Sequence, residues 1–592
     1  MDIAVDADRN GEVSFAGTDA TTEEDPFRFW INDDDDGEQS YSEEVGDSGT
    51  KDHETFGFLD TNAIKNVRDL EDFFRLWIDL PDSIIEAIEN DNLQIGLKWA
   101  NATGSPAVNL FKAVENDGGI LYLTETATAE AQIEGEFDNP IKSEDGDTTV
   151  ESGQTFVLKK EVFEDVGTTR DSVFLICEGA GVGKGELQLV ILDSDGNEIG
   201  TGPGVWMNLL NVKSMYERAL ASVSFGAPWS YAESGDVPSF SVTAATDSQG
   251  HTFKKPDDET EECLVFVHGW KMEAPDVEVF GETMFKRLWW QGYKGRFRAF
   301  RWPTYTGDYS FSDSEFMAWK TGSAFKSYVE GNVSGASLPS GYSMKVAAHS
   351  LGNVVVGGAL ADGLSLDNYL MMQAAIPSGC FNTSDAVNGF AHPGAASSAF
   401  DAVPAILALK TTFGQQENTN PSPDYSNPDF GYRGYVQNPD VIVTTNFCNP
   451  EDYALTTGSF MVFGTNWLTW QLSYKPRKRT LSGSGEINFE YGYLSTANAG
   501  ERLKLTRFTD SNHDTIDAER FVGDSHESMA QIARTRSLPV GADRQAGGIV
   551  DVTVNLDTEH GFTDSRSDHS GQFRRPIQTV FGLYEAIMTA LE

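Results

Sequence analysis

The second half of the chain alternates short apolar runs with longer amphipathic segments. Cys263 to Val267 is a continuous apolar run, typical of a strand that is buried on both faces of a sheet. Asp276 to Trp290 has the spacing of a helix with one apolar face, formed by Val277, Phe280, Met284 and Leu288. Further apolar runs follow at 297–304, 344–347, 369–376 and 441–445. This alternation predicts a mostly parallel sheet covered by helices on both faces.

The end of the chain continues the same pattern. Residues 549–556 alternate apolar and polar positions like a strand, and Pro576 to Leu591 reads as a helix with proline at its start. Its apolar positions are Ile577, Val580, Leu583, Tyr584 and Ile587. We expect one domain over 261–592, with insertions at about 381–440 and 456–548. These insertions exceed ordinary loop lengths, so they should cap the site or hold extra structure.

Residues 56–215 carry a different pattern. Short alternating runs lie between turn residues, for example at 93–99, 120–124, 156–158 and 186–192. Regularly spaced strands of this kind predict an antiparallel, sandwich-like β module. Residues 216–260 then form a polar connection, which we interpret as a linker. The fold class predicted for the whole chain is therefore an α/β domain preceded by an all-β, sandwich-like domain and an acidic N-terminal segment.

The charge of the chain excludes several partners. Its 592 residues contain 43 Lys and Arg against 91 Asp and Glu, a formal net charge of −48. Such a surface repels nucleic acids and anionic membranes, and it suits high salt, which favours a marine or halophilic source. No apolar run is long enough to predict a membrane span. Met1 precedes Asp2 without a basic or apolar leader, which fits a cytosolic protein or a mature exported one, and the N-terminal acidity favours a secreted or cell-surface protein.

The acidic segment 1–55 contains two loops with candidate calcium ligands. Asp6, Asp8 and Asn10 alternate before Gly11, and a second acidic loop lies at 32–37. Alternating oxygen ligands with a glycine at the bend suit calcium. Gly17 stands where an EF-hand loop has its last acidic ligand, so the first loop departs from that motif. The alternative interpretation is a pair of solvated acidic turns.

A glycine-rich stretch at 179–184 looks like a phosphate-binding loop but fails on register. Glu178 occupies the place of the first glycine, and Gly185 that of the Ser or Thr that would bind magnesium. Nucleotide binding is therefore rejected.

The most informative chemistry lies at Ala348 to Asn353, between two apolar runs. A serine at a sharp strand-to-helix turn exposes its hydroxyl, and small residues two positions before and after it keep the turn free of clashes. Ala348 and Gly352 meet that requirement around Ser350, the candidate nucleophile. The same short pattern also occurs in ordinary strand-to-helix turns, so the neighbouring segments must decide between the two.

The run that ends at Val267 is followed by His268, Gly269 and Trp270. With the turn at Ser350, this stretch resembles the α/β-hydrolase superfamily, and more narrowly its esterase and lipase-like members with an Ala-His-Ser-Leu/Met-Gly-Asn turn. The resemblance covers about 260–380, 440–456 and 548–592. It implies an oxyanion hole formed by the N–H of Leu351 and that of Trp270 or Lys271. His268 is then expected to be buried and hydrogen-bonded, with an orienting role at most.

The resemblance also implies the order serine, acid, histidine along the chain. It assigns the acid to Asp452, after the strand at 441–447, with Glu451 as the alternative. It assigns the base to His569, between the last strand and the last helix, with His560 as the alternative. His513 and His526 lie in the second insertion and are expected at the surface.

Two features near the expected site remain open at this stage. Cys380 and Cys448 follow neighbouring predicted strands and would either form a disulfide or pack as thiols. Aromatic residues crowd the segment 270–319, where most should pack in the core, with Trp270 and Tyr305 exposed to substrate.

Together these residues predict a serine hydrolase of carboxylic esters, esterase or lipase-like, whose substrate is a small or polymeric ester. Catalysis needs no metal, and calcium would be structural only. The alternatives are an inactive hydrolase-fold protein used for binding or surface assembly, and an amidase or peptidase with the same triad. Metal catalysis has no supporting motif. Glycoside hydrolysis by paired carboxylates would leave the serine turn and the terminal histidine unexplained.

Overall fold

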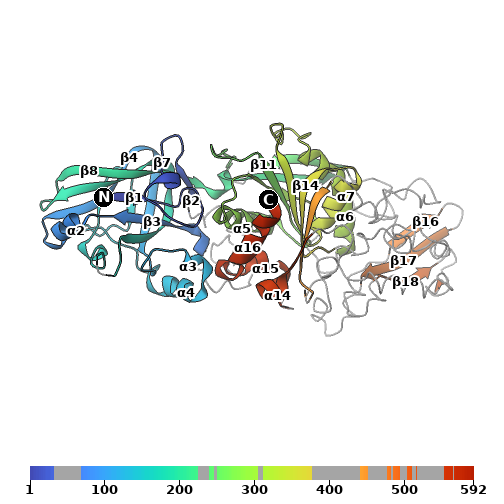
Figure 1. The fold of residues 1–592 in the computed structure, drawn as a ribbon. Coiled ribbons are helices and arrows are strands. Elements are labelled where there is room, and N and C mark those ends of the chain that lie inside the picture. The colour runs from blue at the N-terminus through green and yellow to red at the C-terminus, as the bar shows by residue number, and fades with distance from the viewer. Residues whose placement is uncertain are drawn as a thin grey trace.

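The computed structural model contains two sheets of eight strands each and one of four (Figure 1). The residues that it describes are 1–31, 69–167, 169–224, 239–245, 250–304, 311–375, 441–450, 452, 477–481, 485–493, 503–509, 515–516, 552–563 and 566–592. Among the helices in these ranges, none combines the length and the apolar character needed to cross a membrane.

The N-terminal sheet mixes antiparallel and parallel pairs. Its longest strands, β4 (Leu93–Lys112) and β7 (Val173–Asp193), pair antiparallel over most of their length, whereas β2 (Phe27–Ile31) runs parallel to β8 (Glu198–Asn211). The other strands are β1 (Asp2–Ala4), β3 (Phe73–Asp79), β5 (Thr149–Glu151) and β6 (Thr155–Val157). The helices of this part are α2 (Asp82–Glu89), α3 (Leu121–Thr124) and α4 (Thr126–Gly135). The mixed pairing differs from the antiparallel sandwich predicted from the run pattern, because pattern alone does not reveal strand direction.

The predicted acidic segment 1–55 is not separate from this sheet. β1 and β2 both come from it, and Phe27, Phe29 and Trp30 of β2 are buried. The sequence analysis missed this short apolar strand because acidic residues dominate the composition of the segment around it. The segment therefore contributes to the core of the first sheet.

The rejected phosphate loop lies within β7. A Cβ added at Gly179 would come within 2.4 Å of the Trp30 carbonyl oxygen, and one at Gly181 within 2.4 Å of the Ser105 carbonyl oxygen. These glycines let neighbouring strands approach closely. The glycine-rich stretch thus serves strand packing.

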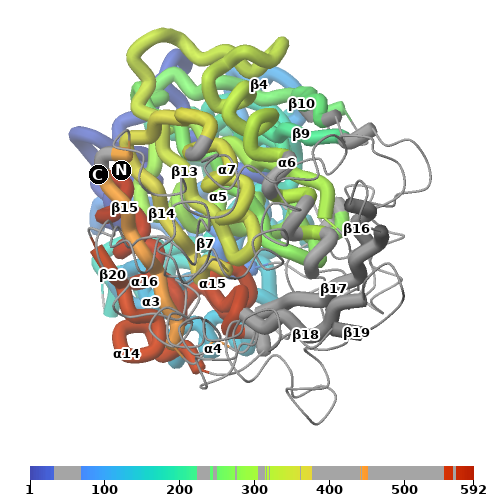
Figure 2. Tube along the Cα trace, turned by 90° about the vertical axis from the view of Figure 1, so that its right-hand side faces the viewer, coloured from blue at the N-terminus to red at the C-terminus, as the bar shows by residue number. Residues whose placement is uncertain are grey.

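The second sheet has the order β10-β9-β12-β11-β13-β14-β15-β20, and every pair from β9 to β20 is parallel. β10 joins the edge antiparallel to β9. The strands are β9 (Glu217–Ser224), β10 (Ser239–Ala245), β11 (Glu262–Val267), β12 (Arg296–Arg301), β13 (Ser343–His349), β14 (Leu366–Met372), β15 (Val441–Cys448) and β20 (Val552–Asn555). Figure 2 shows β20 and β15 at one edge of this sheet and β9 and β10 at the other. β9 and β10 fall in the predicted linker 216–260, so these two parts of it belong to the sheet.

Helices cover both faces of the second sheet (Figure 1). α5 (Ala274–Trp290) and α16 (Ile577–Leu591) lie on one face, and α6 (Phe311–Val329) and α7 (Gly352–Ala361) on the other. This division follows from right-handed crossovers between parallel strands, because β12 and β13 flank β11 on opposite sides. Both α5 and α16 bury the apolar faces predicted from their spacing.

The second insertion holds structure of its own. β16 (Arg477–Leu481), β17 (Gly485–Tyr493), β18 (Leu503–Thr509) and β19 (Thr515–Ile516) form an antiparallel four-stranded sheet. The first insertion, 381–440, lies outside the described residues.

The two large sheets meet through an aromatic cluster. Trp289 of α5 lies 5.2 Å, between ring centroids, from both Phe29 and Trp30 of β2. Trp289, Trp290, Tyr293 and Trp302 are all buried, as expected for aromatic residues that pack in the core. Aromatic packing thus forms part of the junction.

Candidate active site

Ser350 occupies the turn between β13 and α7 and has a left-handed backbone, with φ at +51°. This conformation costs energy for a residue with a side chain, so the surroundings must hold it. The Ser350 N–H donates to the Met372 carbonyl (2.9 Å), and the Ala375 N–H donates to the Ser350 carbonyl (3.1 Å). The end of the neighbouring strand β14 therefore maintains the strained turn.

The small residues around Ser350 allow the turn to press against the end of β11. A Cβ added at Gly352 would lie 2.4 Å from the His268 carbonyl oxygen. One added at Gly269 would lie 3.0 Å from Ser350 Cβ. Ala348 is fully buried. Close approach, rather than flexibility, explains why this part of the chain needs small residues.

Ser350, His569 and Asp452 form one hydrogen-bonded series. Ser350 Oγ lies 2.8 Å from His569 Nε2, and His569 Nδ1 lies 2.8 and 2.9 Å from the two Asp452 carboxylate oxygens. With Nδ1–H donating to the carboxylate, Nε2 is left to accept the serine proton. The Asp452 side chain is fully buried, and that of His569 is 16% exposed. The geometry suits the activation of a serine hydroxyl.

Strand order brings these residues together. Ser350 directly follows β13, and Asp452 lies four residues after the end of β15. Polar groups at the carboxyl ends of neighbouring parallel strands meet at one edge of a sheet. His569 lies in a short 3₁₀ helix, η13 (Arg566–Ser570), between β20 and α16. Along the chain, Ser350 follows β13, Asp452 follows β15 and His569 follows β20, so the three residues have the order expected from the sequence.

Gln373, at the end of β14, is a site residue that the sequence analysis missed. It is fully buried, has φ at +45°, and donates its side-chain amide to Asp452 and to the Asp568 carbonyl (2.8 Å). A strained, buried polar residue between two strands that carry catalytic candidates suggests a functional constraint. Gln373 fell inside the predicted run 369–376, and a single polar amide within that apolar run was the available signal.

A second group anchors the segment that carries His569. Asp568 accepts two hydrogen bonds from Arg575 (2.8 Å each), one from the Thr563 N–H (2.8 Å) and one from the Thr563 hydroxyl (2.7 Å). Burial alone would raise the pKa of the Asp568 carboxyl, but these hydrogen bonds outweigh it and hold the pKa below the usual value. Asp568 therefore stays ionised and fixes the turn beside the histidine.

His349, directly before the serine, supports the same segment. Its Nε2–H donates a hydrogen bond to the His569 carbonyl oxygen (2.6 Å). Burial lowers the pKa of His349 well below its usual value, and the neighbouring His569 adds to this effect. His349 is thus a neutral donor that ties the serine turn to the histidine turn.

The predicted oxyanion residues lie on both sides of Ser350. Leu351 caps the N-terminus of α7, where backbone N–H groups face outward. Lys271 has φ at +65°, and its N–H donates to Thr304 Oγ1 (3.3 Å). This hydrogen bond already engages one of the two alternative donors. Trp270 also has an interaction partner within the protein, so the choice between Trp270 and Lys271 as the partner of Leu351 stays a prediction.

His268 is buried and hydrogen-bonded, as expected. Its Nδ1–H donates to the Gly269 carbonyl (2.9 Å), and its Nε2 accepts from the Trp302 N–H (3.0 Å). Burial lowers the pKa of His268 to about 3. The neutral ring holds the ends of β11 and β12 together, which positions the loop that carries Trp270.

Some of the remaining predicted residues are described by the structure, and the others lie outside the described ranges. His560 ends helix α14 (Leu556–His560), and its carbonyl accepts from Arg575, while His569 is the histidine that contacts Ser350. Cys448 is buried, and its pairing with Cys380 stays open because Cys380 is not among the described residues. Trp270 is half-buried. Outside the described residues lie Glu451, Tyr305, Cys380, His513, His526 and the acidic loop at 32–37.

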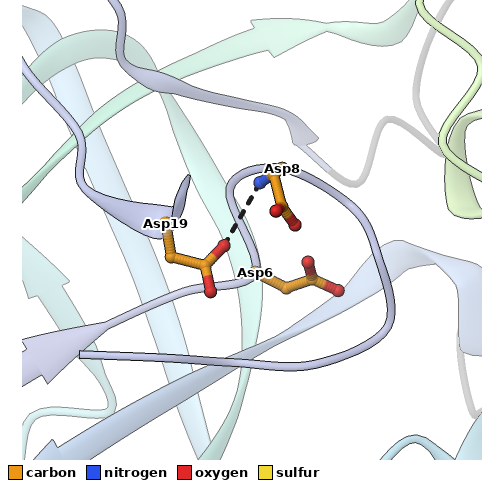
Figure 3. A group of neighbouring side chains, drawn as sticks. All are labelled: Asp6, Asp8 and Asp19. Carbon is orange, nitrogen blue, oxygen red and sulfur yellow. Dashed lines mark hydrogen bonds between the residues drawn. The ribbon is translucent and has the colours of Figure 1, made fainter. Parts of the chain in front are cut away.

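The candidate calcium loop brings Asp6 and Asp8 together with Asp19, whereas Asn10 takes another role (Figure 3). Asp6 accepts from the Asn10 and Gly11 N–H groups and from Arg75, and Asp19 accepts from the N–H groups of residues 7, 8 and 14. The Asn10 side-chain oxygen accepts from the Glu12 N–H. The carboxylates thus already have donors within the protein, and calcium binding stays a prediction.

Comparison of the chain with protein-family models, with curated proteins and with solved structures finds no match. The functional assignment must therefore come from the geometry of the site.

Proposed function

We propose that this protein is a serine hydrolase that cleaves carboxylic esters through an acyl-enzyme intermediate. The observation that carries the proposal is the continuous series of hydrogen bonds from Asp452 through His569 to Ser350 Oγ. A serine hydroxyl is a weak nucleophile at neutral pH, so it needs a base, and the base needs a group that holds its orientation. The three residues meet both needs.

In the proposed mechanism, His569 Nε2 takes the proton of Ser350 while Oγ attacks the ester carbonyl carbon. The carbonyl oxygen becomes an oxyanion, which the N–H of Leu351 and that of Trp270 or Lys271 stabilise. His569 then gives its proton to the leaving alcohol, and the acyl group stays on Ser350. Water attacks this acyl-enzyme with His569 again as base, which releases the acid. Asp452 holds the ring and stabilises its protonated form throughout.

We further propose that the second sheet has the α/β-hydrolase fold. The support is its parallel strand order, its helices on both faces and the sequence of serine, acid and histidine after β13, β15 and β20. A left-handed serine between a strand and a helix also fits the nucleophile turn of such enzymes.

Labelling with a fluorophosphonate probe tests the proposal directly. Ser350 should be the labelled residue, and turnover of short p-nitrophenyl esters should fall by about 10⁵-fold or more in Ser350→Ala, because the nucleophile is lost. Ser327→Ala is the matched control, since Ser327 is half-buried on α6 and donates to the Ser323 carbonyl. Because of the net charge, both assays belong at high as well as low salt.

The other outcomes are equally informative. Label on a different serine, or unchanged turnover in Ser350→Ala, contradicts the proposal. A folded protein without label or turnover points to a binding role for the same fold. Faster cleavage of amides than of matched esters would move the substrate class to amidase or peptidase.

A further inference from the structure

The N-terminal part of the chain reaches the candidate site through a short 3₁₀ helix, η3 (Leu70–Asp72), that packs against α5. Two adjacent carboxylates of η3 form buried ion pairs with two adjacent cations of α5. Glu71 pairs with Arg287 (2.9 Å), and Asp72 pairs with Lys286 (2.6 Å). Trp290 of α5 also donates its ring N–H to the Glu71 carbonyl (2.9 Å). These contacts fix η3 on the helix.

Arg287 connects this junction to the segment of His569. Its Nε donates to Glu71, and its Nη1 donates to the Gln572 carbonyl (2.8 Å). Gln572 lies three residues after His569, in helix α15 (Gly571–Arg574). The same carbonyl accepts from Tyr584 of α16 (3.0 Å). One guanidinium thus holds both Glu71 of η3, from the N-terminal part, and the main chain beside the candidate base.

Burial makes this connection stiff. The Arg287 side chain is fully buried, and Glu71 is 1% exposed. Burial alone would lower the pKa of Arg287, but Glu71 outweighs it and raises the pKa above the usual value. Removing the negative partner of a buried guanidinium is strongly destabilising, because an uncompensated charge is left in the core. The planar arrangement of its N–H donors also fixes the angle between its two partners. The position of Glu71 therefore sets where Arg287 holds the Gln572 carbonyl.

We propose that Glu71 is a positioning residue for His569, so that the N-terminal sheet completes the active site of the second one. The effect passes through Arg287 and the Gln572 main chain to the 3₁₀ helix that carries the base. This inference rests on the proposed role of His569 as general base. It gives the N-terminal part a function in catalysis beyond that of a spacer or binding module.

The test compares two neighbouring substitutions in the full chain, Glu71→Gln and Asp72→Asn. Each removes one buried charge from the same turn and the same junction. Only Glu71 binds Arg287, while Asp72 binds Lys286 and the Trp30 ring N–H (2.7 Å). We expect Glu71→Gln to lower kcat by roughly 10- to 100-fold with little change in KM, because a small misplacement of a catalytic group has such effects. Asp72→Asn should keep kcat near that of the unmodified protein.

The rate of fluorophosphonate labelling at Ser350 provides a second readout, because it depends on activation of the serine and not on ester binding. It should fall in parallel with kcat in Glu71→Gln. Both variants are compared at a temperature where thermal unfolding shows each to be fully folded. A merely structural role would lower the melting temperature of both variants and leave the labelling rate of the folded protein unchanged.

Arg287→Lys separates the charge pair from the link to Gln572. Lysine keeps a positive charge near Glu71, but a single ammonium lacks the fork that binds two partners at fixed angles. We expect Arg287→Lys to show the same kcat loss as Glu71→Gln. Equal kcat in all three folded variants and the unmodified protein would overturn the inference. Absence of activity and label in the unmodified protein would instead overturn the proposed function.

Discussion

The two eight-stranded sheets differ in where their strands end. In the second sheet, β13, β14 and β15 run parallel, so Ser350, Gln373 and Asp452 meet at one edge. In the first sheet, the long pair of β4 and β7 is antiparallel, so their carboxyl ends lie at opposite edges. Parallel order gathers polar groups into a site, whereas the antiparallel pair disperses them. The first sheet instead offers its buried carboxylates Glu71 and Asp72 at the junction with α5.

Buried carboxyls of the two regions also differ in pKa. In the N-terminal part, the pKa of Asp6 and that of Asp72 are raised, because burial outweighs the opposite effect of Arg75 on Asp6 and of Lys286 on Asp72. In the second part, burial again acts to raise the pKa of Glu282 and Asp568, but their cationic and hydrogen-bonding partners outweigh it and lower the pKa. The comparison shows that the balance between burial and charged or hydrogen-bonding partners decides the sign of the shift.

Substitution of Gln373 should give the largest of the effects expected from this comparison. Gln373→Met keeps the volume but removes the amide that donates to Asp452 and to the Asp568 carbonyl. We expect kcat/KM for p-nitrophenyl esters to fall by roughly 10- to 100-fold, because the acid loses part of its orientation. The acid limb of the pH–rate profile should move as well. Steady-state kinetics across pH measure both.

Gln578→Met is the matched control, because Gln578 is a buried glutamine of α16 outside these hydrogen bonds. It should keep the ester kinetics of the unmodified protein. If Gln373→Met also kept these kinetics, Gln373 would make no contribution to catalysis beyond that of Ser350, Asp452 and His569.

Asp568 should make stability depend on pH in the second region. Its folded-state pKa lies below the ordinary value of 3.8, so its contribution is present above that pH and is lost as pH falls through the folded-state pKa. Asp568→Asn should cost roughly 2 kcal/mol at neutral pH, because hydrogen bonds to an ionised group are lost. Below pH 3.8 the difference between Asp568→Asn and the unmodified protein should shrink. Urea unfolding at a series of pH values measures it.

Asp6 provides the opposite case in the first region. Its folded-state pKa is raised above 3.8, so its contribution is present below that pH and is lost as pH rises through the folded-state pKa. The Asp6→Asn variant should therefore become more stable relative to the unmodified protein as pH rises from 3.8, that is, its free energy of unfolding should increase relative to that of the unmodified protein. Parallel pH profiles for Asp568→Asn and Asp6→Asn would contradict the contrast between the two regions.

Calcium should have the smallest effect. The Asp6 and Asp19 carboxylates already accept backbone N–H groups, and Asp6 also pairs with Arg75, so we expect weak binding at most. At a calcium concentration five times Kd, the stabilisation would be about 1 kcal/mol. Thermal unfolding with calcium and with magnesium measures it. Asp8→Asn should remove the calcium effect. A rise of many degrees would instead show a strong site in the first region.

Several elements could be predicted because their signals are local. The apolar faces of α5 and α16 follow from helical spacing, and the strands of the second sheet from continuous apolar runs. Ser350 was identifiable because the small residues around it meet a local steric need. β1, β2, β9 and β10 were missed because strands that are short or rich in polar residues have weak patterns. Gln373 and the pair of Asp568 with Arg575 were missed because their partners are set by packing.

The sequence by itself determined helices α5 and α16, strands β11 to β15 and the strained turn at Ser350, since each depends on residues within a few positions of one another. Only the tertiary structure decided which histidine and carboxylate reach that serine, because His569 lies 219 residues from Ser350 and 117 from Asp452. The same holds for Glu71 and Arg287, which are 216 residues apart. Hydrogen bonds between such distant residues depend on strand order and domain packing, which periodicity along the chain does not encode.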